Sequence, residues 1–246
     1  MDRLVYTAMS GAKSALDRQG MVSNNLANAS TVGFRSDVAV YRAIPVQGDG
    51  LATRTSVLES TPATNFDNGP LIDTGRALDI AITGPGFLAV EAPDGSEAYT
   101  RAGSLEIDAE GTLVTKNGAK VLGDGGPIAV PPNTTVSIGK DGTITGIPTA
   151  PPLKGVTILG RIKLVNPEET NVKKGPDGLF RLKDGSTANL DEKVSVTAGA
   201  VEGSNVNPAG AMIDMIALAR QFEMHMKMIT NGEENDKAAT QLLNTN

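Results

Sequence analysis

Cysteine is absent from the 246-residue sequence, which excludes a disulfide framework, a thiolate nucleophile and a sulfur-ligated metal centre. Tryptophan is absent too, and aromatic residues make up only 3% of the chain, so a β-rich binding module would lack the aromatic platform that carbohydrate binding uses. Histidine occurs once, and a catalytic triad or a multi-histidine metal site would have to be built around that residue. We therefore expect no enzyme activity, no metal and no cofactor.

Long apolar runs and clustered basic residues are also missing. No window approaches the roughly 18 to 20 consecutive apolar residues that span a bilayer, so we expect no membrane insertion. The formal net charge is -6 and the pI is near 4.9, which argues against a nucleic-acid partner because phosphate binding needs a basic patch. Charged residues from Asp2 to Arg18 interrupt the amino terminus, so the sequence predicts no cleavable signal peptide. These features fit a cytoplasmic protein or one exported unfolded by another route.

An amphipathic helix is predicted over residues 1 to about 30. The segment contains no proline, and 4-3 spacings place its apolar residues in one stripe that only Gln19 interrupts. Alanine dominates the stripe, so it offers little burial but allows another backbone to approach closely. Asn28, Ser30 and Gly33 supply stop signals. The stripe consists of Met1, Val5, Ala8, Ala12, Ala15, Val22 and Leu26.

A second stripe predicts a helix at the carboxyl end, within residues 201–246. Its spacings of 3, 4, 3, 4 and 3 are typical of a coiled-coil seam. Asn207 and Pro208 supply a capping side chain and a proline suited to the first helical turn. Gly232 weakens this helix by about 1 kcal/mol relative to alanine, which makes it a potential kink. The predicted seam consists of Met212, Met215, Ala219, Phe222, Met226 and Ile229.

Between the two ends the apolar period changes to two. Segments such as ALDIAIT, GFLAVEA and GRIKLV read as short strands, and the pairs Asp94-Gly95, Asn117-Gly118, Asp141-Gly142, Asp177-Gly178 and Asp184-Gly185 predict tight turns. Residues 76–200 are therefore interpreted as a central antiparallel β sandwich or barrel-like domain, and residues 34–75 as an extended connecting region. The expected fold is mainly β with α-helical termini.

Two amphipathic ends that flank a β domain cannot each hide an apolar face alone. An isolated helix of about 25 to 30 residues is marginal in water, so the ends must pair with each other or with neighbouring subunits. We expect residues 1–33 and the carboxyl-terminal helix to form a coiled-coil-like layer that becomes ordered on assembly. The methionine stripe fits either ordinary intramolecular packing or an intersubunit seam, and the matching stripe at the other terminus favours the seam.

The residues and short motifs that could suggest a catalytic, metal or phosphate site have simpler interpretations. His225 lies beside the predicted seam, where an interface or solvated helix position is favoured over a chemical role. The Asp-Gly pairs lack the alternating oxygen ligands of a calcium loop. The glycine-rich runs at 84–86 and 123–126 lack the Lys-Ser/Thr and the following helix of a phosphate-binding loop. Carboxylate pairs such as Glu233-Glu234 lie in polar surroundings that favour solvated surface.

Three motifs in order along the chain resemble the flagellar rod and hook protein family. The first is NNLANASTVGFR, from Asn24 to Arg35, which follows the family pattern of a helix ending in N-N-L-A-N and then T-x-G-F with a basic residue. The second runs from LDIAITGPGFLAV through AYTRAGSLEID and GTLVT to GPIAVP, and the third is GAVEGSNVNPAGAMIDMIALARQFEMHMKMIT with EENDKAATQLL. Within the family, ARQFE and EEND are similar to the proximal-rod member rather than the distal-rod member.

The resemblance implies a structural subunit of the proximal rod of the bacterial flagellar basal body, needed for motility. It implies an inner layer of terminal helices and an outer layer of β domain. It also implies other rod proteins and further copies of the chain as partners, a periplasm-spanning location, and passage through the flagellar type III export apparatus. Besides the two stripes, the residues expected to take part in interactions are Asn24, Asn25, Leu26, Asn28, Gly33 and Phe34.

Overall fold

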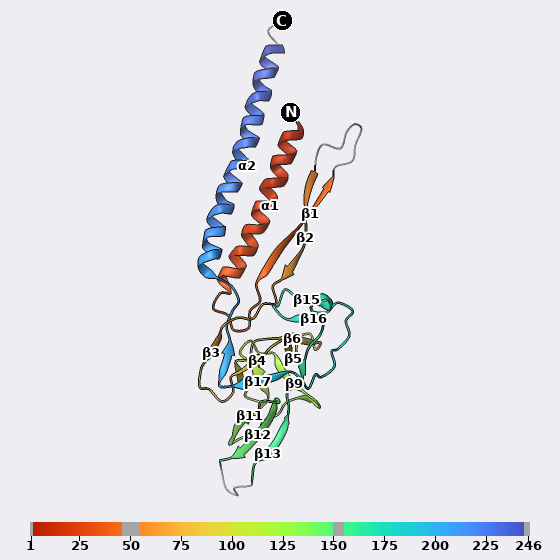
Figure 1. Ribbon diagram of the computed structural model, residues 1–246, viewed down its shortest axis with the longest axis vertical. Helices are drawn as coiled ribbons and strands as arrows, with labels where there is room; N and C mark the ends of the chain where they lie inside the picture. Colours follow the sequence, from red (N-terminus) through yellow and green to blue (C-terminus); the bar gives the residue numbers. More distant parts are fainter. Residues whose placement is uncertain (1, 46–54, 150–154, 244–246) are drawn as a thin grey trace. The chain divides into compact units, whose positions relative to one another are not determined.

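The structure, a computed structural model, describes residues 2–45, 55–149 and 155–243 (Figure 1). The chain divides into two compact units. Residues 1–29, 36–65 and 206–246 form the first unit, and residues 30–35 and 66–205 form the second. The chain therefore passes from one unit to the other and back before the long central segment begins.

The first unit contains two helices and a hairpin. Helix α1 (Asp2–Ala27) and helix α2 (Pro208–Leu243) lie side by side and run antiparallel, so that the start of α1 and the end of α2 lie at the same end of the pair (Figure 1). Strands β1 (Asp37–Pro45) and β2 (Thr55–Thr64) pair antiparallel and pack against α1. None of the described helices is both long enough and apolar enough to cross a membrane.

The ends of the helices confirm the predicted signals. The Asn207 side chain accepts a hydrogen bond from the Gly210 N–H at 3.2 Å, and Pro208 opens α2, as expected for an N-cap followed by proline. At the end of α1 the Asn28 N–H donates to the Asn24 carbonyl at 3.1 Å. Helix α2 runs through Gly232 as one helix, so the glycine does not divide it.

The second unit is an antiparallel β structure. Its largest sheet has the order β15-β16-β6-β5-β9-β8-β7, with β10 on β9 and β14 on β5; β11, β12 and β13 form a second sheet, and β17-β4 and β18-β3 form ribbons. The strands are β3 Leu71–Asp73, β4 Ile80–Thr83, β5 Phe87–Glu91, β6 Glu97–Thr100, β7 Leu105–Ile107, β8 Leu113–Thr115, β9 Lys120–Gly123, β10 Gly126–Pro127, β11 Thr134–Ile138, β12 Thr143–Pro148, β13 Thr157–Arg161, β14 Leu164–Val165, β15 Val172–Lys174, β16 Phe180–Leu182, β17 Ser195–Ala198 and β18 Ala200–Glu202, with a 3-10 turn at Glu169–Asn171.

Strand β5 lies between two hydrophobic clusters. Leu88 and Val90 point into a large cluster shared with β4, β8, β9, β12 and β17, whereas Phe87 and Ala89 point into a smaller aromatic cluster with Tyr99. The alternation follows from the two-residue period of a strand, and burial on both faces explains why GFLAV reads as a continuous apolar run. The arrangement is sandwich-like. Because the largest sheet has two ends in the part of the chain that the structure describes, the barrel alternative is not supported.

All five predicted Gly turns have the expected conformation, with glycine φ values of 79°, 83°, 82°, 78° and 72° at positions 95, 118, 142, 178 and 185. In four of them the aspartate carboxylate also accepts the N–H two residues on, for example Thr143 N–H to Asp141 at 3.1 Å. The aspartates therefore act as turn residues, as their sequence context indicated.

Candidate assembly interface

From Val5 to Leu26 the predicted stripe of α1 lies on the covered side of the helix, while Met1 lies outside the described residues. Ala8, Ala12 and Ala15 are buried, at 2%, 6% and 2% exposure, and Val5, Val22 and Leu26 are half-buried. Gly11, beside this stripe, meets α2 directly: a Cβ built there would lie 2.7 Å from Nε2 of His225. The small side chains thus let the two helix backbones approach closely.

The covered stripe on α2 shares every second residue with the predicted seam. At the positions between them, the covered residue is the one just before the predicted residue. Met215, Phe222 and Ile229 are half-buried, and between them Leu218 is only 3% exposed. Their 4-3 spacing continues through further covered residues, so the inward stripe consists of Ala211, Met215, Leu218, Phe222, His225, Ile229 and Gly232. Three members of the predicted seam lie outside it: Ala219 is half-buried, and Met212 and Met226 are exposed at 54% and 44%. These three positions lie on an adjacent flank of the helix.

Large apolar side chains remain exposed on both helices. On α2 they lie on more than one side: Ile216, Met212 and Met226 on one flank, and Ile213, Met224 and Met228 further round. Their exposures reach 67% at Ile213 and 61% at Met224, and on α1 Tyr6, Met9 and Leu16 are exposed at 66%, 53% and 48%. A helix that is apolar on several sides is normally surrounded by other elements, and apolar patches left in contact with water mark interaction sites.

His225 packs its ring against Gly11, and its Nδ1 is buried without a hydrogen-bond partner. No group of three potential metal ligands occurs among the residues that the structure describes. The ring therefore fills the space between α1 and α2.

The asparagines of the first motif act on the backbone around the end of α1. The Asn25 side chain donates to the Asp37 carbonyl at 2.8 Å and accepts from the Asp37 N–H at 2.9 Å, which ties α1 to the first residue of β1. The Asn28 side chain donates to the Asn24 carbonyl at 2.9 Å. Asn24 itself is exposed and Leu26 is half-buried. Two of the three asparagines thus have a local structural role, which the sequence pattern alone did not specify.

Gly33 and Phe34 belong to the second unit. Gly33 has a φ of 69°, its N–H donates to the Glu202 carbonyl at 2.7 Å, and a Cβ there would overlap the backbone of Arg101. The ammonium group of Lys174 lies 4.1 Å from the centre of the Phe34 ring, within the range of a cation–π contact. Glycine is required at position 33 because both the conformation and the space exclude a side chain.

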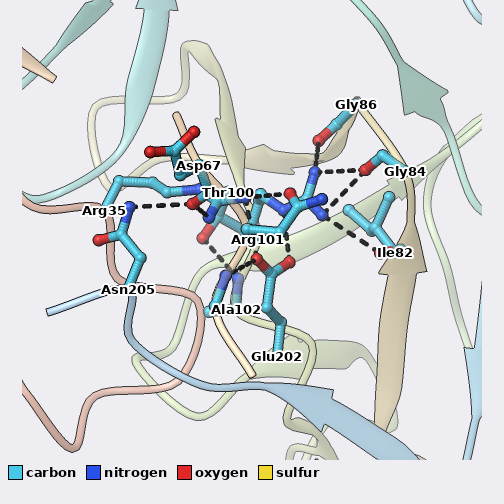
Figure 2. A network of polar contacts seen from close by, with 12 residues as sticks. Arg35, Asp67, Ile82, Gly84, Gly86, Thr100, Arg101, Ala102, Glu202 and Asn205 are labelled. Atoms are coloured by element: carbon cyan, nitrogen blue, oxygen red, sulfur yellow. Dashed lines mark hydrogen bonds and ion pairs between the residues drawn. The ribbon is translucent and has the colours of Figure 1, made fainter. Parts of the chain in front are cut away.

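Arg35, the residue after Phe34, belongs to a buried ionic cluster with Arg101 and Glu202 (Figure 2). The Glu202 carboxylate contacts the Arg35 guanidinium at 2.9 Å and accepts from Nε of Arg101 at 2.6 Å, and all three side chains are at most 3% exposed. Arg101 also donates to the carbonyls of Ile82, Gly84 and Gly86. These carbonyl dipoles compensate for the second positive charge, which one carboxylate alone cannot neutralise.

Arg35 completes its contacts at the other side of the cluster. It donates to the Asp67 carbonyl and, at 3.0 Å, to the Asn68 side chain. Burial lowers the pKa of the Arg35 guanidinium, while the Glu202 carboxylate favours its charged form. The sequence patterns did not predict a site at Arg101 and Glu202. The signal was available, because each lies inside a quoted motif, in AYTRAG and GAVEGSN.

The sequence matches three family descriptions in the same order as the motifs. Residues 5–35 match "Flagella basal body rod protein", residues 81–146 match "Flagellar hook protein FlgE/F/G D1 domain", and residues 197–242 match "Flagellar basal body rod FlgEFG protein C-terminal". Arg35, Arg101 and Glu202 fall one in each region, so the ionic cluster joins all three. These matches define the chain as a member of the flagellar rod and hook proteins.

Comparison with individual relatives shows which member of this family the chain resembles most strongly among those compared. The chain is 45% identical over 249 residues to the flagellar basal-body rod protein FlgF of Salmonella typhimurium and, equally, of Escherichia coli, with 99% of both chains covered in each case. The similarity to the rod protein FlgG of Buchnera aphidicola is lower, at 31% identity over 261 residues, which cover 94% of this chain and 97% of the relative. The chain belongs to the FlgF family of flagellar basal-body rod proteins.

Proposed function

We propose that the chain is a subunit of the proximal part of the flagellar rod and that it polymerises with its neighbours through α1 and α2. The observation that carries the proposal is the set of large apolar side chains still exposed after the two helices have packed together, from Tyr6 on α1 to Met228 on α2. Family membership supports a structural role in the rod and hence in motility.

Within one subunit, the helices would form a coiled-coil-like layer. Both covered stripes follow 4-3 spacings, small residues on α1 lie opposite larger ones on α2, and Gly11 meets His225 at the centre of the pair. In this proposal the unit that contains α1, α2 and the β1-β2 hairpin is the inner assembly domain, and the β unit of residues 30–35 and 66–205 is the outer domain.

Between subunits, the flank carrying Met212, Ile216, Ala219 and Met226 would meet the helices of a neighbour. Burying a half-exposed methionine or isoleucine contributes on the order of 1 kcal/mol. One contact of this kind is weak, so strength would come from repetition around and along the rod. This lattice of many modest contacts would carry torque.

The partners would be further copies of the chain and the neighbouring rod proteins, a choice supported by full-length similarity to FlgF and FlgG relatives. The location would be the periplasm-spanning rod. Membership of the flagellar rod protein family supports delivery by the flagellar type III export apparatus.

The test replaces Met226 with aspartate in the full chain. Because Met226 is 44% exposed in the subunit, Met226→Asp should leave the helix content of the purified protein unchanged and yet remove the subunit from isolated basal bodies. Asn235→Asp places the same carboxylate at an exposed polar position of α2 and should assemble normally. Normal incorporation and swimming of the Met226→Asp strain would refute a contact through this flank.

A truncation gives a second test. Deleting residues 1–30 should leave a folded, monomeric β unit, because the clusters around β5 contain no residue of that segment, and should abolish incorporation into the rod. If the truncated chain assembled normally, the terminal helices would not be the means of polymerisation.

A further inference from the structure

Methionine is the most readily oxidised side chain in this protein. The sequence contains eight methionines and neither cysteine nor tryptophan. A cysteine thiolate would normally react with peroxide first, and here nothing of that kind competes. Which thioether reacts then depends on how accessible each sulfur is.

Three accessible methionines lie within five residues of α2. Met224, Met226 and Met228 are exposed at 61%, 44% and 45%. Met224 and Met228 are one turn apart and therefore neighbours on the helix surface, while Met226 lies on the flank proposed to meet another subunit. Met215, on the inward stripe against α1, is half-buried instead. The same helix thus provides both the reactive positions and an internal comparison.

We propose that Met224, Met226 and Met228 form an oxidation site at which peroxide blocks assembly of the free subunit. In the reaction the thioether sulfur attacks one oxygen of hydrogen peroxide, the O–O bond breaks, and water leaves. The sulfur is oxidised by two electrons to the sulfoxide and one peroxide is reduced to one water, so atoms and electrons balance. The consequence for assembly rests on the proposed function, since it requires this part of α2 to be buried between subunits.

The sulfoxide changes the chemistry of the surface. It converts a flexible apolar side chain into one with a strong hydrogen-bond acceptor. Burying that oxygen in an apolar contact with a neighbouring subunit, where no donor meets it, is unfavourable. Oxidation therefore acts on a subunit before it is incorporated, and incorporation in turn shields the three sulfurs from peroxide.

Peptide mass spectrometry tests the site itself. Trypsin releases Gln221–Lys227, which holds Met224 and Met226, and Met228–Lys237, which holds Met228. After brief treatment of the purified full-length protein with hydrogen peroxide, these sulfurs should be oxidised faster than Met215, and the same treatment of isolated basal bodies should leave them largely reduced. Equal rates at Met215 and the three exposed positions, or equal oxidation in free and assembled protein, would overturn the proposal.

A strain comparison tests the consequence. The triple variant Met224→Leu, Met226→Leu, Met228→Leu and its Met215→Leu control are both built in a chain that already carries Met9→Leu and Met212→Leu, because these two methionines are also exposed, at 53% and 54%. Both are compared with wild type, each measured as subunit incorporated under sublethal peroxide relative to its own incorporation without peroxide. That ratio should fall about threefold or more in wild type and Met215→Leu and stay near one in the triple variant. An equal fall in all three would overturn the proposal. Failure of wild type to incorporate without peroxide would instead refute the assembly function.

Discussion

Gly11 of α1 and His225 of α2 are in direct contact: the imidazole occupies the space that a side chain at position 11 would need, with Nδ1 only 2.8 Å from the Cβ position. Gly20, on the same helix, has nothing within 4 Å of its Cβ position. Alanine substitutions at these two glycines therefore distinguish the effect of close packing from the effect of helix propensity.

Gly20→Ala should stabilise the protein by about 1 kcal/mol, because alanine is the better helix former. Gly11→Ala gains the same propensity but displaces the ring, at a cost of about 1–3 kcal/mol for overpacking. Chemical unfolding followed by helix circular dichroism measures both. The double variant Gly11→Ala, His225→Ala should recover part of the difference. If Gly11→Ala were as stable as Gly20→Ala, the helices would not be in contact at this position.

Replacing Gly33 should be far more damaging than replacing a glycine with equal backbone strain. Alanine at a positive φ costs about 1–2 kcal/mol, which is the whole effect expected for Gly118→Ala, whose Cβ would meet nothing within 4 Å at φ 83°. Gly33→Ala adds overlap with the Arg101 backbone, so its loss should exceed that of Gly118→Ala by about 2 kcal/mol or more. Urea unfolding of the two variants provides the comparison, and equal losses would argue against the close approach.

Glu202→Gln should destabilise the second unit by about 3–5 kcal/mol, because it leaves two buried guanidinium groups without their carboxylate. The control is Glu233→Gln, which removes a carboxylate 3.3 Å from Lys237 where both side chains are at least 65% exposed. A surface pair of this kind contributes about 0–1 kcal/mol. A difference of less than 1 kcal/mol between the two variants in denaturant unfolding would contradict the ionic role of Glu202.

Tyr99 should ionise late in an alkaline titration. Burial raises the pKa of Tyr99 to about 12. Its hydroxyl donates to Glu97 at 3.0 Å and accepts from the Ala188 N–H at 2.6 Å, whereas Tyr6 is 66% exposed. Because the folded pKa is raised, the contribution of Tyr99 to stability is present below its unfolded value of about 10 and is lost as the pH rises towards 12.

Ultraviolet difference absorbance of wild type and Tyr99→Phe should therefore differ in an ionisation step near pH 12. A Tyr99→Phe protein that lost an early step instead would show that the phenol is accessible.

Phe222→Asp illustrates how the structure changes an expectation. From the sequence, Phe222 and Met226 belong to one seam, and a charge at either position should block motility in the same way. In the structure Phe222 is half-buried on the inward stripe and Met226 is exposed. Phe222→Asp should therefore lower the melting temperature of the isolated subunit, whereas Met226→Asp should not, as thermal unfolding monitored at α2 would show.

The offset in the α2 stripe has a physical cause. Met212, Ile213, Met215 and Ile216 are all apolar, so hydropathy alone does not decide which side of the first turns faces α1. The α1 stripe was predictable because polar residues flank it. On α2 the choice depends on shape, with Gly11 accepting the ring of His225, and such complementarity between distant segments is not visible in a single periodic pattern.

The β unit likewise has features that the sequence predicts and features that it does not. Its turns were predictable, since Asp-Gly and Asn-Gly specify local conformations that tertiary contacts did not override. Strand order and the ionic cluster were not, because the contact between Arg35 and Glu202 joins residues that are far apart in the sequence. The family motifs identified the three segments, and only the folded chain shows that they meet.

The ends of the 66–205 segment are fastened to one another. The Gly69 N–H donates to the Glu202 carboxylate and the Asn205 side chain donates to the Asp67 carbonyl, each at 2.9 Å. Tension applied to one end of this segment can pass to the other end through these few bonds, without first loading the sheets between them. These two hydrogen bonds join the ends of the segment directly. Changes in the length or number of the strands between them would therefore leave the path of force along the chain unchanged.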